Sequence, residues 1–152
     1  GAEVAADPYA LAGGLGIVLG EGGGALERMV TPFKLFAGGP IGSGEQWMSW
    51  IHRDDLVRLI EMALADGRVG GAVNGTAPDP RTMRDFARTL GQVLSRPSWA
   101  PVPAFVLRLA LGEMADMLLT GQRVLPGVAT RLGFSFEYPT LDRALRQALA
   151  LG

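Results

Sequence analysis

With 152 residues, 48% of them hydrophobic and only 19% charged, the chain is the size of one domain or of part of a larger one. This apolar balance is typical of a piece that covers another surface. A net charge of −1 leaves no basic footprint, so we expect no nucleic-acid partner. Because there is no cysteine, disulfides and thiolate metal sites are excluded.

The sequence also predicts no association with a membrane. The longest apolar stretch, residues 102–111, is interrupted by Pro103 and Arg108 and is too short to span a bilayer. Near the start, Glu3 and Asp7 stand where a signal peptide would carry basic residues. We therefore expect a cytoplasmic protein.

In the first half of the chain, glycine-rich breaks separate short apolar runs. Ile17 and Val18 are β-branched and predict a buried strand, while the glycines of 38–44 predict a loop. An aspartate at 54 or 55 suits the positive end of a helix. The expected elements are a helix end over 3–12, a strand over 15–19, a turn over 21–24, a helix over 25–36, a strand over 46–51 and a helix from Asp54 or Asp55 to about Ala65.

In the second half, helices predominate. Thr82 is expected to cap a helix through Leu94, with Met83, Phe86, Ala87, Leu90 and Val93 facing inward. The other expected elements are a strand over 72–75, helices over 103–111, 113–120 and 126–132, a short strand over 134–136 and a helix to Leu149 capped by Thr140.

This order of elements predicts an α/β fold with an α-rich carboxyl-terminal portion. The predicted sheet is too small to be doubly wound by itself. We divide the chain into residues 1–80, with the strands and the glycine and tryptophan loop, and residues 81–152, a helical lobe.

No dinucleotide-binding or P-loop fingerprint is present. A dinucleotide fold needs three glycines at fixed offsets, so that backbone can approach the pyrophosphate. Gly14-x-Gly16 and Gly22-x-Gly24 each lack the third glycine. Lys34, the single lysine, is not preceded by glycine, which excludes a P-loop.

Four motifs together resemble one protein family. They are Gly16-Ile17-Val18-Leu19-Gly20 with the glycines after it, Gly42 to Leu56 (GSGEQWMSWIHRDDL), Asn74-x-Thr76-Ala77-Pro78, and Gly112 to Pro126. The family is the atypical, epimerase-like branch of the extended short-chain dehydrogenase/reductases, with a carboxyl-terminal segment of the DUF1731 type. The chain resembles the carboxyl-terminal half of such a protein. Its relatives have a longer β-branched strand with an arginine before the first motif, where this chain has Leu11-Ala12-Gly13.

The resemblance implies a partial Rossmann-like fold, and in the intact relative an NAD or NADP cofactor near Leu15, Gly16 and Ile17. The family's catalytic Tyr-x-x-x-Lys pair is missing, because Tyr9 is followed four residues later by Gly13 and Tyr138 by Asp142. We therefore assign no catalytic residue and expect no cofactor on this chain alone.

The tryptophan loop supplies the candidate substrate contacts. Gln46 and Ser49 are candidate polar ligands, Trp47 a candidate pocket wall with Trp50 in the core, and His52 a candidate substrate ligand. Each has a structural alternative. His52 can instead bond to backbone just ahead of the following helix, and the two aspartates after it can act as helix caps. Asn74 is expected to hold the loop of Pro78-Asp79-Pro80.

Two functions remain open from the sequence. The first is the substrate-binding portion of an NAD(P)-dependent epimerase/dehydratase-like oxidoreductase that acts on a small sugar- or nucleotide-like molecule. It would need the missing amino-terminal Rossmann half, or a second copy, as its partner. The alternative is a non-catalytic module for protein binding or oligomerisation.

Overall fold

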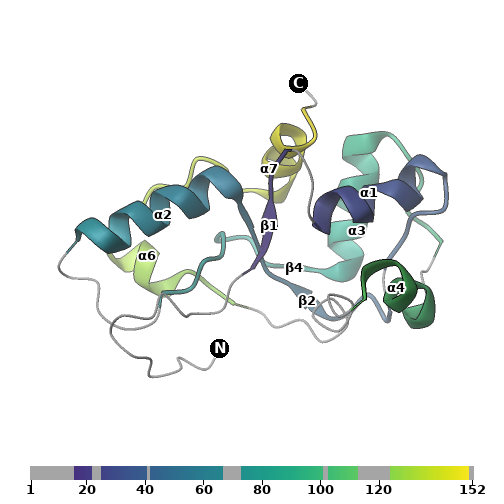
Figure 1. Cartoon of the computed structure of the whole chain (residues 1–152), viewed down its shortest axis with the longest axis horizontal. Helices are drawn as coiled ribbons and strands as arrows, with labels where there is room; N and C mark the ends of the chain where they lie inside the picture. Colours follow the sequence, from purple (N-terminus) through teal and green to yellow (C-terminus); the bar gives the residue numbers. More distant parts are fainter. Residues whose placement is uncertain are drawn as a thin grey trace.

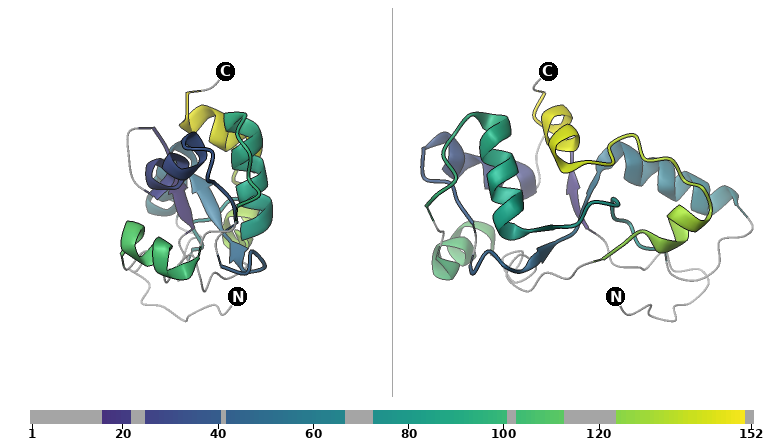
Figure 2. Two further views of the ribbon diagram at one scale, coloured as in Figure 1. Left: turned by 90° about the vertical axis from the view of Figure 1, so that its right-hand side faces the viewer. Right: turned by 180° about the vertical axis from the view of Figure 1, so that it is seen from behind.

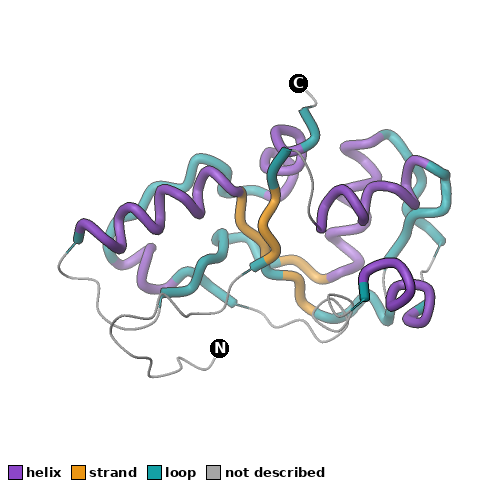
Figure 3. The backbone as a smooth tube through the Cα atoms, viewed as in Figure 1, coloured by secondary structure: helices purple, strands orange, loops and turns teal. Residues whose placement is uncertain are grey.

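The computed structural model describes residues 16–21, 25–40, 42–66, 73–100, 103–112 and 124–150. Its strands lie in the middle of the molecule, with helices on either side (Figure 3). Strand β1 (Ile17–Leu19) pairs in parallel with β3 (Trp50–His52), so that Ile17 lies opposite Trp50 and Leu19 opposite His52. A second, antiparallel pair joins β2 (Trp47–Met48) to β4 (Arg81–Thr82).

The larger hydrophobic cluster lies on one side of the parallel pair (Figure 1). It is formed by helices α1 (Ala25–Lys34), α3 (Met83–Leu94) and α7 (Leu141–Ala148), together with Leu19 and Trp50 from the strands. Helix α4 (Ala104–Leu111) packs against α1. This cluster holds most of the fully buried side chains, so it is the main core.

A smaller cluster lies on the other side, between helix α2 (Arg53–Ala65) and helix α6 (Gly127–Arg131). Leu59 of α2 and Ala129 of α6 both belong to this cluster, and α6 lies below α2 in the right-hand view of Figure 2. Successive strand residues point to opposite faces, so Trp50 enters the main core while Ile51 enters the smaller one. The strand β3 therefore links the two clusters.

Most predicted helices are confirmed. The α3 helix begins where predicted, because the Thr82 hydroxyl accepts a hydrogen bond from the Asp85 N–H. All five residues expected to face inward from α3 are buried. The α/β class is also confirmed.

Other predictions are corrected by the structure. The strand expected over 46–51 is two short strands in different sheets, separated at Ser49. Residues 134–136 form no strand, and neither do 73–75, where Gly75 makes only an isolated bridge. The predicted segments 3–12 and 113–120 lie outside the described residues.

The division of the chain at residue 80 stays a prediction. Helix α1 packs against α3, so the contacts of the main core cross that boundary. Among the helices of the described ranges, none combines the length and the apolar character that crossing a bilayer requires.

Candidate functional site

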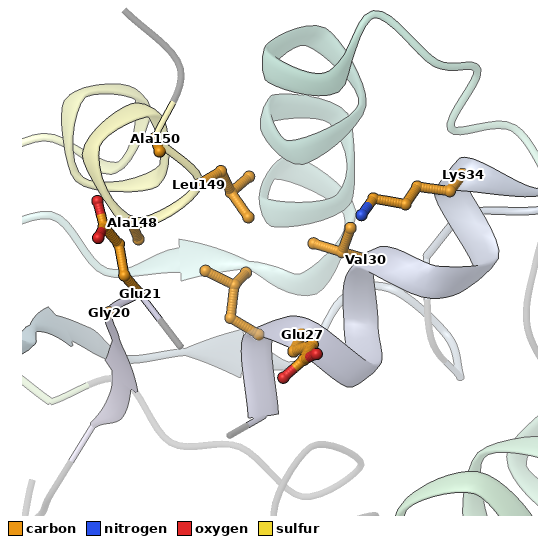
Figure 4. A pocket seen from close by; sticks show the side chains of 9 residues that line it. Gly20, Glu21, Glu27, Val30, Lys34, Ala148, Leu149 and Ala150 are labelled. Atoms are coloured by element: carbon orange, nitrogen blue, oxygen red, sulfur yellow. The ribbon is translucent and has the colours of Figure 1, made fainter. Parts of the chain in front are cut away.

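A cleft of about 460 Å³ opens at the carboxyl end of β1 (Figure 4). Its floor and walls come from the loop after β1, from one face of α1 and from the end of α7. Ligands of parallel α/β sheets bind in the crevice beyond the carboxyl ends of the strands. The lining residues are Gly20, Glu21, Leu26, Glu27, Val30, Lys34, Ala148, Leu149 and Ala150.

The cleft combines an apolar surface with three charged side chains. Leu26, Val30 and Leu149 supply apolar surface, and the Lys34 ammonium extends over the cleft from the last turn of α1 (Figure 4). Glu21 and Glu27 carry the opposite charge. An apolar surface with a few polar groups at its rim is the usual make-up of a small-molecule site.

His52 lies at the carboxyl end of β3 and is fully buried. Its Nδ1 accepts a hydrogen bond from the Asp54 N–H at 3.0 Å, and its Nε2 is 2.5 Å from the Gln147 Oε1. Because a backbone N–H can only donate, Nδ1 carries the lone pair and Nε2 donates its proton to Gln147. Both nitrogens are thus used within the chain, and His52 is itself the cap of α2.

The His52 ring also stacks on Tyr138, with ring centroids 4.0 Å apart. Desolvation raises the pKa of the Tyr138 phenol above its ordinary value of 10.0, and the carboxylates of Glu137 and Asp54 raise it further. Tyr138 therefore stays protonated at neutral pH.

Asp55 is the buried member of the aspartate pair and joins α2 to the segment before α7. Its two carboxylate oxygens accept hydrogen bonds from the N–H groups of Glu137 and Tyr138, each at 2.9 Å. Arg58 donates to the same carboxylate at 3.0 Å. Asp55 was expected to be a helix cap, so its role in holding a segment more than 80 residues away corrects that prediction.

The predicted substrate contacts Gln46, Trp47 and Ser49 do not line the cleft. The side chain of Gln46 accepts a hydrogen bond from the Ser43 hydroxyl, and Trp47 is partly exposed on β2. The Ser49 hydroxyl accepts a hydrogen bond from the Val124 N–H at 3.0 Å. Their binding of a substrate stays a prediction, as does that of His52.

The predicted cofactor contacts Gly16 and Ile17 lie at the opposite end of β1 from the cleft. The Gly16 N–H donates to the Gly75 carbonyl at 3.1 Å, and the Ile17 N–H donates to the Ser49 carbonyl at 2.9 Å. The structure therefore brings Gly16, Ile17 and Ser49 together, while Leu15 lies outside the described residues. Cofactor binding by these residues stays a prediction.

Asn74 contacts the segment before α6. Its side-chain amide donates to the Leu125 carbonyl at 3.1 Å, which ties the segment before α6 to the segment 73–77 beside the parallel pair. In the described ranges, no group of three histidine or acidic side chains is arranged to hold a metal ion.

The comparisons with known proteins agree with the fold. Residues 102–148 match the family model described as a domain of unknown function (DUF1731). Over 132 residues the chain is 54% identical to the epimerase family protein SDR39U1 homolog, chloroplastic, of Arabidopsis thaliana, covering 87% of this chain and 38% of that protein. With the epimerase family protein YfhF of Bacillus subtilis it shares 47% identity, covering 89% of this chain and 44% of that protein. This chain is homologous to the carboxyl-terminal portion of epimerase-family proteins.

Solved structures support the same relationship. The human epimerase family protein SDR39U1 (isoform 2), determined with NADPH, superposes with a TM-score of 0.81 at 42% identity, covering 90% of this chain and 46% of that one. A nucleoside-diphosphate sugar epimerase from Corynebacterium glutamicum superposes with a TM-score of 0.67 at 29% identity, covering 89% of this chain and 25% of that one. The chain thus spans less than half the length of these relatives, and the Rossmann-like class predicted for it is confirmed.

The cleft was not predicted from the sequence. A strand followed by Glu21 and three glycines and then by a helix is a signal for a ligand crevice. The third wall, residues 148–150, lies near the carboxyl terminus, and no local sequence pattern indicates that these residues line a cleft.

Proposed function

We propose that this chain is the substrate-facing portion of an NAD(P)-dependent oxidoreductase of the epimerase family, and that its cleft receives a small sugar- or nucleotide-like substrate. The cofactor, NADPH or NADH, would be held mainly by the amino-terminal part that the longer relatives have. The observation that carries the proposal is the open cleft at the carboxyl end of β1 in a chain homologous to epimerase-family proteins.

The residues of the chain support this assignment of the substrate to the chain and of the cofactor to the amino-terminal part. They contain neither the glycine fingerprint nor a Tyr-x-x-x-Lys pair. Four residues after Tyr9 and Tyr138 stand Gly13 and Asp142 instead of lysine. Both ring nitrogens of His52 are engaged in hydrogen bonds within the chain. The chain therefore offers a place for a substrate, while the glycine fingerprint and the tyrosine-lysine pair of the family would belong to the amino-terminal part.

The experiment compares two proteins in thermal-shift titrations with NADPH and with NADH. One is this chain, and the other is a fusion of the amino-terminal part of the Bacillus subtilis relative to this chain. A ligand at a hundredfold excess over its Kd stabilises a fold by roughly 2.7 kcal/mol, which raises the Tm of a domain of this size by a few degrees. We expect this rise for the fusion and no rise for the chain alone. A cofactor-dependent rise with the chain alone would contradict the proposal.

A module for protein binding or assembly is the second candidate. It is favoured by the exposed apolar side chains of α4, among them Phe105 and Leu109. Under this alternative the chain would associate with itself or with another protein, and the fusion would bind neither cofactor. Sedimentation of the chain alone and the titration of the fusion separate the two candidates.

A further inference from the structure

Helix α2 carries an apolar stripe on the side away from the smaller cluster. Its members are Val57, Ile60 and Leu64, whose side chains are 49%, 37% and 77% exposed. Residues three and seven positions along a helix lie on one face, so the three side chains form a continuous row. Leu59, on the opposite side of the helix, is buried against α6 and the strands.

The position of α2 in the fold makes this stripe unusual for a solvent-facing surface. The helix connects β3 to the segment 73–77, and this segment returns beside the parallel pair: the Ala77 N–H donates to the Trp50 carbonyl and the Gly75 carbonyl accepts from the Gly16 N–H. A helix that connects neighbouring parallel segments belongs to a layer that covers the sheet. Helices in such a layer lie side by side, and their flanks are apolar where they touch.

The relatives are long enough to supply a helix beside α2. The chain covers 38% of the Arabidopsis relative and 44% of the Bacillus relative, so more than half of each lies outside the matched region. A parallel sheet with both faces covered needs more strands and helices than the described residues supply. The relatives therefore have enough additional chain to supply a further helix of the covering layer.

We propose that Val57, Ile60 and Leu64 form the docking face for an apolar helix in the amino-terminal part of the full-length protein. This inference rests on the proposed function, because it takes the amino-terminal part as the partner of the chain. It also specifies the surface through which the chain contacts the amino-terminal part. None of the residues of this surface lines the cleft. The exposed residues of α4 are not part of this face.

The absence of cysteine from the chain gives a direct test. A single cysteine is introduced as L64C, and as L109C in a matched control at a leucine of α4 that is 84% exposed. The rate of modification by a thiol reagent is measured in the isolated chain and in the fusion with the amino-terminal part, whose own cysteines are replaced by serine. Thiol reactivity depends on solvent access, so we expect the L64C thiol to react at least about tenfold more slowly in the fusion than in the chain. The L109C thiol should react at similar rates in both. Equal L64C rates in the two proteins would overturn the proposal.

A second variant tests the same surface without labelling. Leu64→Glu should lower the Tm of the fusion by several degrees and leave that of the isolated chain nearly unchanged, whereas Leu109→Glu should have the same small effect in both. An equal effect of Leu64→Glu in the two proteins would count against the docking face. The cofactor titration separates the two proposals. Protection of the L64C thiol without NADPH or NADH binding would retain the docking face and reject the proposed function. Cofactor binding without protection of the thiol would retain the proposed function and reject the docking face.

Discussion

Asp55 is the residue on which the junction between α2 and the 137–138 segment depends most. Its carboxylate is fully buried and accepts hydrogen bonds from two backbone N–H groups and from Arg58. Removing it leaves buried donors without a partner, and such losses are costly. We expect Asp55→Ala to lower the free energy of unfolding by about 3 kcal/mol, measured by urea denaturation.

The neighbouring Asp54 is the matched control for this prediction. Its side chain is about half exposed and lies 3.9 Å from Arg53. An exposed carboxylate in the first turn of a helix contributes at most about 1 kcal/mol. If Asp54→Ala destabilised the chain as much as Asp55→Ala, the role assigned to the buried carboxylate would be wrong.

Tyr138 gives a prediction for alkaline pH. Its phenol has a pKa above the ordinary 10.0, mainly through desolvation and then through Glu137. Because the folded chain holds this proton more tightly than the unfolded chain, the stabilisation is fully present below pH 10 and is lost as the pH rises through the raised pKa. Thermal melts between pH 9 and pH 11 should therefore show a steeper fall in Tm for the unchanged chain than for Tyr138→Phe. Identical slopes would contradict this assignment.

At the scale of elements, helices were predictable where their signals are local. The α3 helix carries its cap and its inward face within 13 residues, from Thr82 to Leu94, and both were read correctly from the sequence. The strands depend on distant partners instead. β2 pairs with β4 and β3 with β1, so a run that alternates polar and apolar residues was divided between two sheets.

The alternation of Phe134, Ser135 and Phe136 shows the same limit. The two phenylalanine rings pack edge to face, 4.8 Å apart, beside the smaller cluster. The Phe134 N–H donates to the Ala129 carbonyl, which closes the end of α6. The alternating pattern thus reports side-chain packing, and it does not say whether the backbone joins a sheet. The site has the same dependence on distant residues, since the cleft needs residues 20–34 and 148–150 together.

The parallel pair itself depends on a glycine at its start. A Cβ on Gly16 would lie 2.8 Å from the Trp50 nitrogen and 2.9 Å from the Ser49 carbonyl carbon, both backbone atoms that cannot move without disturbing the register. Forcing extra atoms into a packed interior typically costs 1–3 kcal/mol, so we expect Gly16→Ala to destabilise the chain by about 2 kcal/mol.

Gly127, at the start of α6, is the control for this substitution. A Cβ there would have no neighbour within 4 Å, and alanine is the better helix former. Gly127→Ala should therefore leave the urea midpoint unchanged or raise it. Equal losses from the two substitutions would mean that the close approach of β1 to the Ser49–Trp50 backbone does not limit residue 16.

At the scale of the whole molecule, the question is whether the two hydrophobic clusters unfold together. Trp50 and Ile51 are adjacent in β3, yet they belong to different clusters. The Asp55 hydrogen bonds to 137–138 also connect the smaller cluster to the start of α7, which lies in the main core. Because both links are buried, we expect one cooperative transition in which damage to the smaller cluster is felt in the main core.

Leu59→Ala tests this expectation, because Leu59 lies in the smaller cluster and a truncated core leucine costs about 2–5 kcal/mol. Trp50, in the main core, serves as the reporter once the other two tryptophans, Trp47 and Trp99, are replaced by phenylalanine. Urea unfolding is followed by Trp50 fluorescence and by far-ultraviolet circular dichroism. With cooperative clusters, Leu59→Ala lowers both midpoints by the same amount. A Trp50 midpoint that stayed in place while the dichroism midpoint fell would show that the clusters unfold separately, and that the links through β3 and Asp55 are too weak to couple them.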